Sequence, residues 1–136
     1  EALAHGVNCR GVMGAGIAVE FKRRWPAMFE DYAAECVFRM KPGDCHEWLD
    51  PTTGRWIYNL ATQPRPGPCA SLLAIKSALD NMLACSRGAR VKRIGICRVG
   101  TGYGGLRWED VRPLIERAAR DVDIVVVHKE TRGVRR

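Results

Sequence analysis

The segment from Asn8 to Ala18 carries three closely spaced glycines, Gly11, Gly14 and Gly16, between a predicted strand and a predicted helix. Glycine lets the backbone approach a ligand closely, and the first N–H groups of a helix have no partner inside it. Such a turn suits a phosphate or a diphosphate, which the helix dipole also favours. A plain tight turn is the alternative. The glycine order differs from the dinucleotide fingerprint and no P-loop ending follows, so an ATPase is not indicated.

A second glycine-rich loop covers 100–105, where four of the six residues are glycine. It follows a predicted strand over 92–99 and precedes a predicted helix from about Arg107. In open α/β sheets, ligands bind beyond the carboxyl ends of the strands. Because both loops follow strands and lead into helices, together they can hold an extended ligand that has two phosphates with sugars on either side.

Strands and helices alternate along most of the chain, apart from a predicted hairpin over 45–60. This order predicts an α/β fold of three layers, α/β/α, with a central mixed, largely parallel sheet. We expect Ser71 to cap the third helix and Gly88 to stop it. The last strand is continuously apolar, which is typical of a strand buried on both faces. The hydrophobic spacing predicts strands over 1–7, 45–49, 55–60, 92–99 and 123–127, and helices over about 14–24, 28–36, 72–87 and from 107.

The composition describes one globular domain of 136 residues, 46% of them hydrophobic, with a formal net charge of +7. The charge favours anionic partners, although a solvated basic surface is the alternative for most of it. No apolar run is long enough to span a membrane. We expect a monomeric domain over 1–130 and a basic tail over 131–136. Because the sequence opens inside a predicted strand, we also expect an N-terminal strand of the fold to be missing.

The six cysteines and three histidines are scattered, without C-x-x-C spacing. They therefore predict no metal site, and no cofactor is indicated. Since no export signal is visible, we expect reduced thiols in a cytoplasmic protein. Cys9 lies beside the first glycine turn, where it is either a reactive thiol or, as the alternative, a small packing residue.

Four segments together resemble the macrodomain family, in order and spacing over nearly the whole chain. They are Val7 to Ala18, Phe21-Lys22, Tyr58 to Thr62, and Gly100 to Trp108. Within that family they are most similar to the glycohydrolases that remove ADP-ribose from protein or from DNA. The resemblance implies a three-layer fold and a pocket for ADP-ribose.

The resemblance also implies the roles of the loops. The first loop would lie near the diphosphate and the distal ribose, and Asn8, the candidate catalytic residue, beside the ribose hydroxyls. The second loop would wrap the other side of the diphosphate, with Tyr103 closing over the pocket or, alternatively, packing against the sheet edge. Arg98 is expected to face the phosphates or the solvent. The implied ligand-binding residues are Cys9, Gly11, Val12, Met13, Gly14, Ala15, Gly16, Ile17, Thr62, Gln63, Gly100, Thr101, Gly102, Tyr103 and Gly104.

Two positions depart from the pattern of these glycohydrolases. Gln63 stands where they carry a lysine, and Gly104 stands where the protein glycohydrolase carries an aspartate. An amide cannot attack C1″ or form a Schiff base with the opened sugar. The expected function is therefore substrate-assisted hydrolysis of ADP-ribosyl linkages on a modified protein or nucleic acid. The alternatives are a non-catalytic ADP-ribose reader, a phosphatase of ADP-ribose 1″-phosphate and, from another class, a basic module that docks on nucleic acid.

Overall fold

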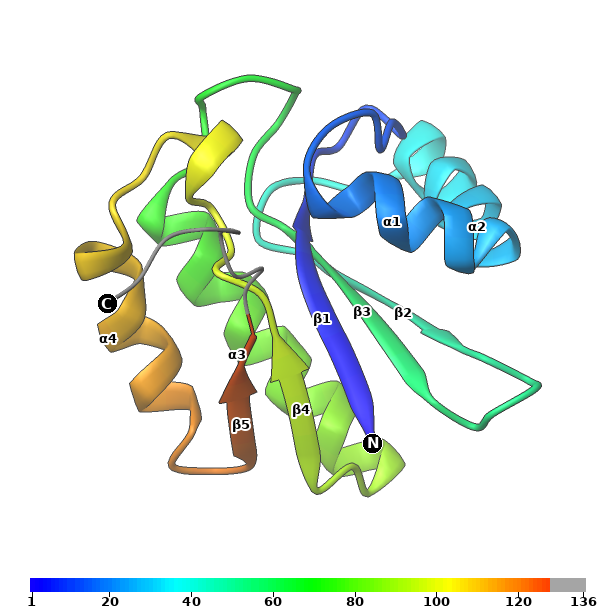
Figure 1. Ribbon diagram of the computed structural model, residues 1–136, viewed down its shortest axis with the longest axis vertical. Coiled ribbons are helices and arrows are strands. Elements are labelled where there is room, and N and C mark those ends of the chain that lie inside the picture. Colours follow the sequence, from blue (N-terminus) through cyan, green and yellow to red (C-terminus); the bar gives the residue numbers. More distant parts are fainter. Residues whose placement is uncertain (128–136) are drawn as a thin grey trace, which may run out of the picture.

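A single five-stranded sheet forms the centre of the protein, in a computed structural model that describes residues 1–127 (Figure 1). The strand order is β2-β3-β1-β4-β5, and only β2 runs antiparallel to its neighbour. The strands are β1 (Ala2–Val7), β2 (Cys45–Leu49), β3 (Trp56–Ala61), β4 (Arg93–Ile96) and β5 (Asp123–Val126). The helices are α1 (Ile17–Arg24), α2 (Pro26–Phe38), α3 (Leu72–Ala89) and α4 (Trp108–Ala118).

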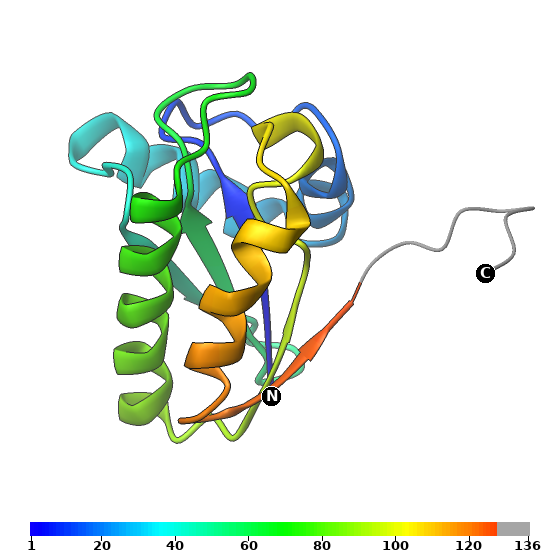
Figure 2. The same ribbon diagram turned by 90° about the vertical axis from the view of Figure 1, so that its left-hand side faces the viewer.

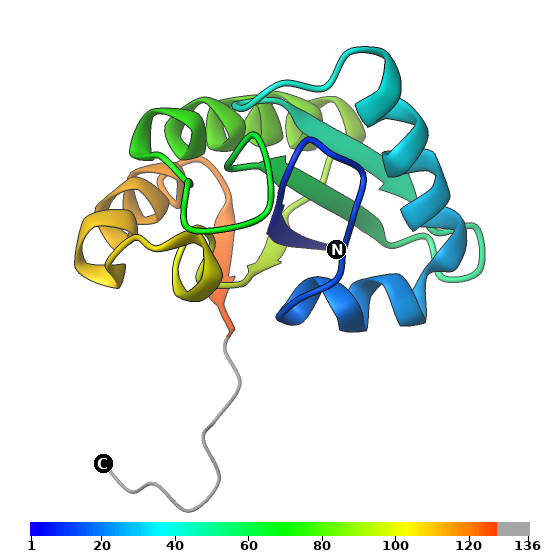
Figure 3. The same ribbon diagram turned by 90° about the horizontal axis from the view of Figure 1, so that it is seen from above.

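The helices cover both faces of the sheet, which confirms the predicted α/β/α layers. In Figure 2, α3 and α4 lie in front of the sheet, and Figure 3 shows α1 and α2 on the opposite side. The alternation in β1 serves both layers. Ala2 and Ala4 pack with the α3 and α4 side, whereas Leu3 and Val7 pack with α1 and α2. A central strand flanked by two parallel neighbours is buried on both faces, as its small and apolar residues allow.

Several helix boundaries differ from the prediction: α1 begins at Ile17 and not at about 14, and α2 covers Pro26–Phe38 and not 28–36. Proline begins α2 at Pro26, because the missing N–H of the first helical residue needs no partner. Ser71 caps α3 as expected, with its hydroxyl oxygen accepting a hydrogen bond from the Ala74 N–H at 3.1 Å. Gly88 does not stop that helix, which continues to Ala89 and ends at Arg90 in the left-handed conformation, with φ of 59°. The prediction for Gly88 was wrong because Arg90 takes the capping role that glycine usually fills.

The last strand is not buried on both faces, contrary to the expectation for 123–127. β5 pairs only with β4, at the edge of the sheet, and its residues alternate between exposed and half-buried. The apolar sequence of β5 therefore did not reveal that it is an edge strand, because strand order depends on contacts between segments that lie far apart in sequence. The predicted basic tail over 131–136 and the domain boundary at 130 lie outside the described residues.

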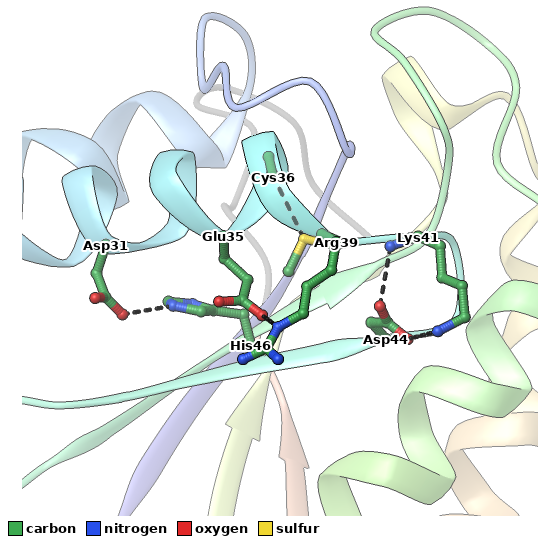
Figure 4. Close-up of polar contacts among 8 residues, drawn as sticks. Asp31, Glu35, Cys36, Arg39, Lys41, Asp44 and His46 are labelled. Atoms are coloured by element: carbon green, nitrogen blue, oxygen red, sulfur yellow. Dashed lines mark hydrogen bonds and ion pairs between the residues drawn. The ribbon is translucent and has the colours of Figure 1, made fainter.

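A chain of polar side chains crosses the α1/α2 side of the sheet. His5 Nε2 lies 2.5 Å from Asn59 Oδ1, Asn59 Nδ2 lies 2.9 Å from His46 Nδ1, and His46 Nε2 lies 2.7 Å from Asp31 Oδ2. Figure 4 shows its outer end, where His46 reaches Asp31 on α2. His5 is fully buried against the Phe21 ring, and burial lowers its pKa to about 4. His5 is therefore neutral at physiological pH.

No helix within residues 1–127 has both the length and the apolar character needed to cross a membrane. The six cysteines are all free thiols. Among those described residues, no three His, Cys, Asp or Glu side chains gather in a way that could hold a metal ion.

Candidate functional site

The two glycine-rich loops meet where the parallel strands end at their carboxyl termini. β1 and β4 are parallel neighbours, so their carboxyl ends point the same way and the loops that follow them lie on the same side of the molecule (Figure 1). A Cβ atom placed on Gly16 would lie 3.3 Å from Cδ2 of Tyr103, which is in the second loop. Between the loops lies a cavity of about 120 Å³, lined by Gly6, Ala15, Gly16, Ile17, Ala18, Thr62, Gln63, Cys97, Arg98, Val99, Gly100, Thr101, Tyr103 and Gly104.

This central cavity continues into a wider recess on each side. A recess of about 360 Å³ shares Gly6 and Gln63 with it and extends to Asn8, Val12, Met13, Gly14, Pro66 and Gly67. We call it the Asn8 recess. A recess of about 840 Å³ shares Gly16, Ile17, Cys97 and Arg98 with the centre and is completed by Val19, Glu20 and Val127. We call it the Val127 recess. The central cavity and the two recesses form one elongated groove, which is narrow in the middle and broader at both ends. An extended ligand fits such a groove.

The backbone of the first loop supplies hydrogen-bond donors at the centre of the groove. Gly16 precedes α1 with φ of 63° and ψ of −147°, a conformation open only to glycine, and no side chain caps the helix there. Ile17 and Ala18 begin α1 and line the central cavity. The first N–H groups of a helix have no partner inside it, and together with the helix dipole they attract an anion.

The second loop is fixed from below by the core. Gly100 has φ of 77°, and a Cβ atom there would lie only 2.5 Å from Cδ1 of Ile75 on α3. Arg98 leads into this loop with its guanidinium 4.8 Å from the centre of the Trp108 ring. Because Arg98 lines the central cavity as well, this contact places a cation at the rim of the groove. Tyr103 is 70% exposed and lines the groove, so it lies over the pocket and does not pack against the sheet edge.

Asn8 holds the first loop in shape. Its Nδ2 donates to the Val12 carbonyl at 3.0 Å, and its Oδ1 accepts from the Arg10 N–H at 2.9 Å. The buried Tyr32 hydroxyl donates to the Asn8 carbonyl oxygen at 2.7 Å. Burial also raises the pKa of Tyr32, so the hydroxyl keeps its proton and stays a donor. The sequence did not reveal this contact, because Tyr32 lies 24 positions from Asn8 along the chain.

The two positions that depart from the glycohydrolase pattern lie against each other. Gln63 Nε2 donates to the carbonyl oxygens of Arg65 and Gly67, both at 2.7 Å, and so ties down the proline-rich loop over 64–68. A Cβ atom on Gly104 would lie 3.2 Å from Gln63 Oε1 and 3.0 Å from the Ala70 Cβ. Gln63 is therefore a brace for the groove wall.

Most of the predicted site residues line the groove, but three do not. Gly11 packs against Ala33 of α2, Gly102 is exposed within the second loop, and Cys9 packs with the core beneath the first loop. Burial raises the pKa of the Cys9 thiol to about 11, so the packing alternative fits this residue better than a reactive thiol. Thr62 lines the central cavity although it is buried, with its hydroxyl donating to the Val7 carbonyl oxygen at 3.4 Å.

Ionisable groups are sparse in the groove. Within the described part of the chain, the linings of the central cavity and the Asn8 recess contain Arg98 but no Asp, Glu, His or Lys. Glu20 lines the Val127 recess, where its carboxylate pairs with Arg23. That hydrogen bond lowers the pKa of Glu20 and keeps it ionised. The side chains at the Asn8 end therefore offer no strong acid or base.

The chain belongs to the macrodomain family, because its sequence matches the Macro domain over residues 4–115. It is 34% identical to the DNA ADP-ribosyl glycohydrolase of Mycobacterium tuberculosis, over 93% of this chain and 38% of that protein. It is 30% identical to the human ADP-ribose glycohydrolase OARD1, over 93% of this chain and 79% of that protein. The solved macrodomain of Mycobacterium tuberculosis DarG superposes with a TM-score of 0.86 at 34% identity, over 93% of this chain and 87% of that one. The chain thus spans well under half of the mycobacterial enzyme's length, and the resemblance to macrodomains is confirmed.

Proposed function

We propose that this macrodomain binds ADP-ribose in the groove and hydrolyses the bond that links it to a modified macromolecule. One observation carries the proposal: two glycine-rich loops close on a single cavity that opens into a recess at each end. The diphosphate would lie in the centre, against the N-terminus of α1 and beside Arg98. The base would occupy the more apolar Val127 recess, and the distal ribose the recess that contains Asn8.

The sparse ionisable lining favours substrate-assisted chemistry. Water attacks C1″ while the bond from C1″ to the modified atom breaks, and the electron pair leaves with that atom. A diphosphate oxygen accepts the proton of the water, and the departing atom takes up a proton. Loop N–H groups and the Asn8 amide stabilise the negative charge that develops on the departing atom, and they orient the water. The names of the relatives, glycohydrolases of DNA-linked ADP-ribose and of ADP-ribose, support this reaction class.

Charge near the open end favours a nucleic acid as the modified macromolecule. Arg10 and Arg65 are exposed on the first loop and on the proline-rich loop, the two segments that flank the Asn8 recess. Neither forms an ion pair with any residue of the described range. Cations at that rim would contact phosphates next to a modified nucleotide. We further propose that the domain acts as a monomer, since one chain supplies the whole groove, and its free thiols fit the cytoplasm.

A turnover assay with three substrates tests the proposal: ADP-ribosylated DNA, ADP-ribosylated protein and ADP-ribose 1″-phosphate. We expect free ADP-ribose to be released from a modified macromolecule, with DNA preferred. Release of phosphate alone would identify a phosphatase instead. Tight binding of ADP-ribose without any turnover would identify a reader, which the weakly ionisable lining also permits. Binding only to nucleic acid, lost with salt, would identify the basic docking module.

Asn8→Ala separates chemistry from binding. We expect both turnover and affinity to fall, because the Asn8 amide also holds the first loop in shape. Turnover should fall at least about tenfold further than affinity, because the amide also acts on the developing charge. The matched control is Asn81→Ala, which also removes an amide that donates to a backbone carbonyl, that of Gly43 at 2.9 Å, but in α3 away from the groove. Equal losses of turnover and affinity in Asn8→Ala would contradict a catalytic role.

A further inference from the structure

Two cysteine thiols line a surface cavity that is separate from the groove. This cavity of about 410 Å³ lies where β2 begins, beside the last turns of α3. Its lining includes Cys45 and Cys85, with Lys41, Asn81 and Ala84 around them. Figure 4 shows the neighbouring charged rim, where Lys41 pairs with Asp44 and Arg39 pairs with Glu35. The cavity therefore opens to the solvent beside both cysteines.

The fold makes the two thiols face each other. His46 points to the α1/α2 side of the sheet, and because side chains alternate along a strand, Cys45 points to the α3 side. Cys85 lies near the end of α3, the helix that packs on that side. Both residues are half-buried and pack against the same core cluster. Both line the same cavity, and each thiol shifts the pKa of the other.

The surroundings make the two thiols chemically unequal. The hydrogen bond from Cys45 lowers the pKa of Cys85, whereas the same pairing and burial raise the pKa of Cys45 well above its ordinary value. A thiolate, and not a thiol, is the nucleophile in disulfide chemistry. Cys85 is thus the more easily ionised member of the pair, and Cys45 is the proton donor beside it. By contrast, burial raises the pKa of both Cys9 and Cys36.

We propose that Cys45 and Cys85 are a modification site, at which low-molecular-weight disulfides form a reversible bond between β2 and α3. The Cys85 thiolate attacks one sulfur of the reagent, which forms a mixed disulfide and releases one thiolate. The Cys45 sulfur, after giving up its proton, attacks the Cys85 sulfur and releases the second thiolate. Two protein thiols and one small disulfide thus become one protein disulfide and two small thiols.

The bond would enclose a long segment of the chain. It closes a loop from Cys45 to Cys85 that contains all of β3 and the segment from Thr62 to Gly67, which includes the brace formed by Gln63. Disulfides in reducing compartments are usually transient and redox-sensing, which fits an unequal pair of thiols beside a surface cavity better than a structural bond. The site is independent of the proposed hydrolysis.

The test uses the full chain and oxidised glutathione as the reagent, with peptide mapping by mass spectrometry. We expect a linked Cys45–Cys85 peptide that dithiothreitol removes, and a rise of roughly 5–10 °C in the unfolding midpoint of the oxidised protein. Cys45→Ser should leave glutathione on Cys85. Cys85→Ser should lose the linked peptide and react at least about tenfold more slowly at Cys45. Cys36→Ser, which removes another half-buried thiol, should form the linked peptide normally. The proposal is overturned if the wild-type protein forms no such peptide, or if Cys36 reacts as fast as Cys85.

Discussion

Gly16 offers the sharpest test of where the ligand binds. Its φ of 63° and ψ of −147° lie in a region that essentially only glycine adopts. A side chain at this position costs about 1–3 kcal/mol in backbone strain, and the Cβ atom would also press on Tyr103 at 3.3 Å. Since Tyr103 is largely exposed, its ring can move aside at little cost. The free Gly16→Ala loop should relax out of this conformation and must return to it to bind the diphosphate, so the substitution should weaken ADP-ribose binding roughly 5- to 150-fold.

Gly16→Glu should remove detectable binding altogether. The carboxylate would project toward the diphosphate, and two like charges about 4 Å apart near a protein surface repel each other by about 4 kcal/mol. Together, the repulsion and the backbone strain should raise the dissociation constant for ADP-ribose by at least about a thousandfold. Isothermal titration calorimetry with free ADP-ribose measures it, and a thermal unfolding curve on each variant shows whether the fold itself has been weakened.

Gly14→Ala is the matched control in the same loop. No atom lies within 4 Å of a Cβ atom placed there, and Gly14 is not among the glycines with positive φ. We expect a smaller loss of affinity than in Gly16→Ala, because no protein atom has to move and Gly14 lines the Asn8 recess but not the central cavity. If Gly16→Glu still binds ADP-ribose, or if Gly14→Ala and Gly16→Ala lose affinity equally, the diphosphate does not lie against the N-terminus of α1.

Three further predictions concern other parts of the molecule. Gln63→Lys should form an adduct with free ADP-ribose that borohydride traps, because an amine at this wall of the groove can attack the opened sugar; mass spectrometry would detect it, and Gln63→Arg should give none. Burial lowers the pKa of His5 to about 4 in the folded protein, so the unfolded chain binds a proton more readily. The free energy of unfolding is therefore highest above the ordinary pKa of histidine and falls as the pH drops below that value. Urea unfolding should lose about 2 kcal/mol between pH 7 and pH 5, and His5→Gln should flatten that slope. Ser71→Ala should lower the free energy of unfolding by about 1 kcal/mol, with Ser71→Asp retaining most of it.

The parts of the site that the sequence could predict are those that local backbone chemistry defines. Gly16 and Gly100 were identified as loop residues because glycine spacing between a strand and a helix is a local signal, and both have positive φ. Ser71 was predicted as a cap for the same reason. The pairing of the two loops followed from the position of each at a strand end. These inferences needed only neighbouring residues and one rule about parallel sheets.

What the sequence could not predict depends on contacts between distant segments. His5 and Asn59 lie 54 positions apart, and nothing in their local sequence links them to His46 or Asp31. The contact of Tyr32 with Asn8 spans 24 positions and joins α2 to the first loop. The edge position of β5 likewise depends on which strand lies beside it. In each case the neighbour of the residue or strand is set by the tertiary fold and not by the local sequence.

The pairing of Gln63 with Gly104 bears most directly on mechanism. An aspartate at position 104 would bring a carboxylate toward Gln63 Oε1, which already lies 3.2 Å from the position of a Cβ atom, and toward Ala70 on the other side. A carboxylate oxygen placed beside the Gln63 amide oxygen would repel it, since neither can donate a hydrogen bond. A lysine at position 63 would instead pair with that aspartate. Glutamine and glycine here therefore form a compatible pair, as lysine and aspartate would. Gly104→Asp alone should therefore cost more stability than Gly104→Asp combined with Gln63→Lys, so adding a carboxylate to this groove requires the double substitution.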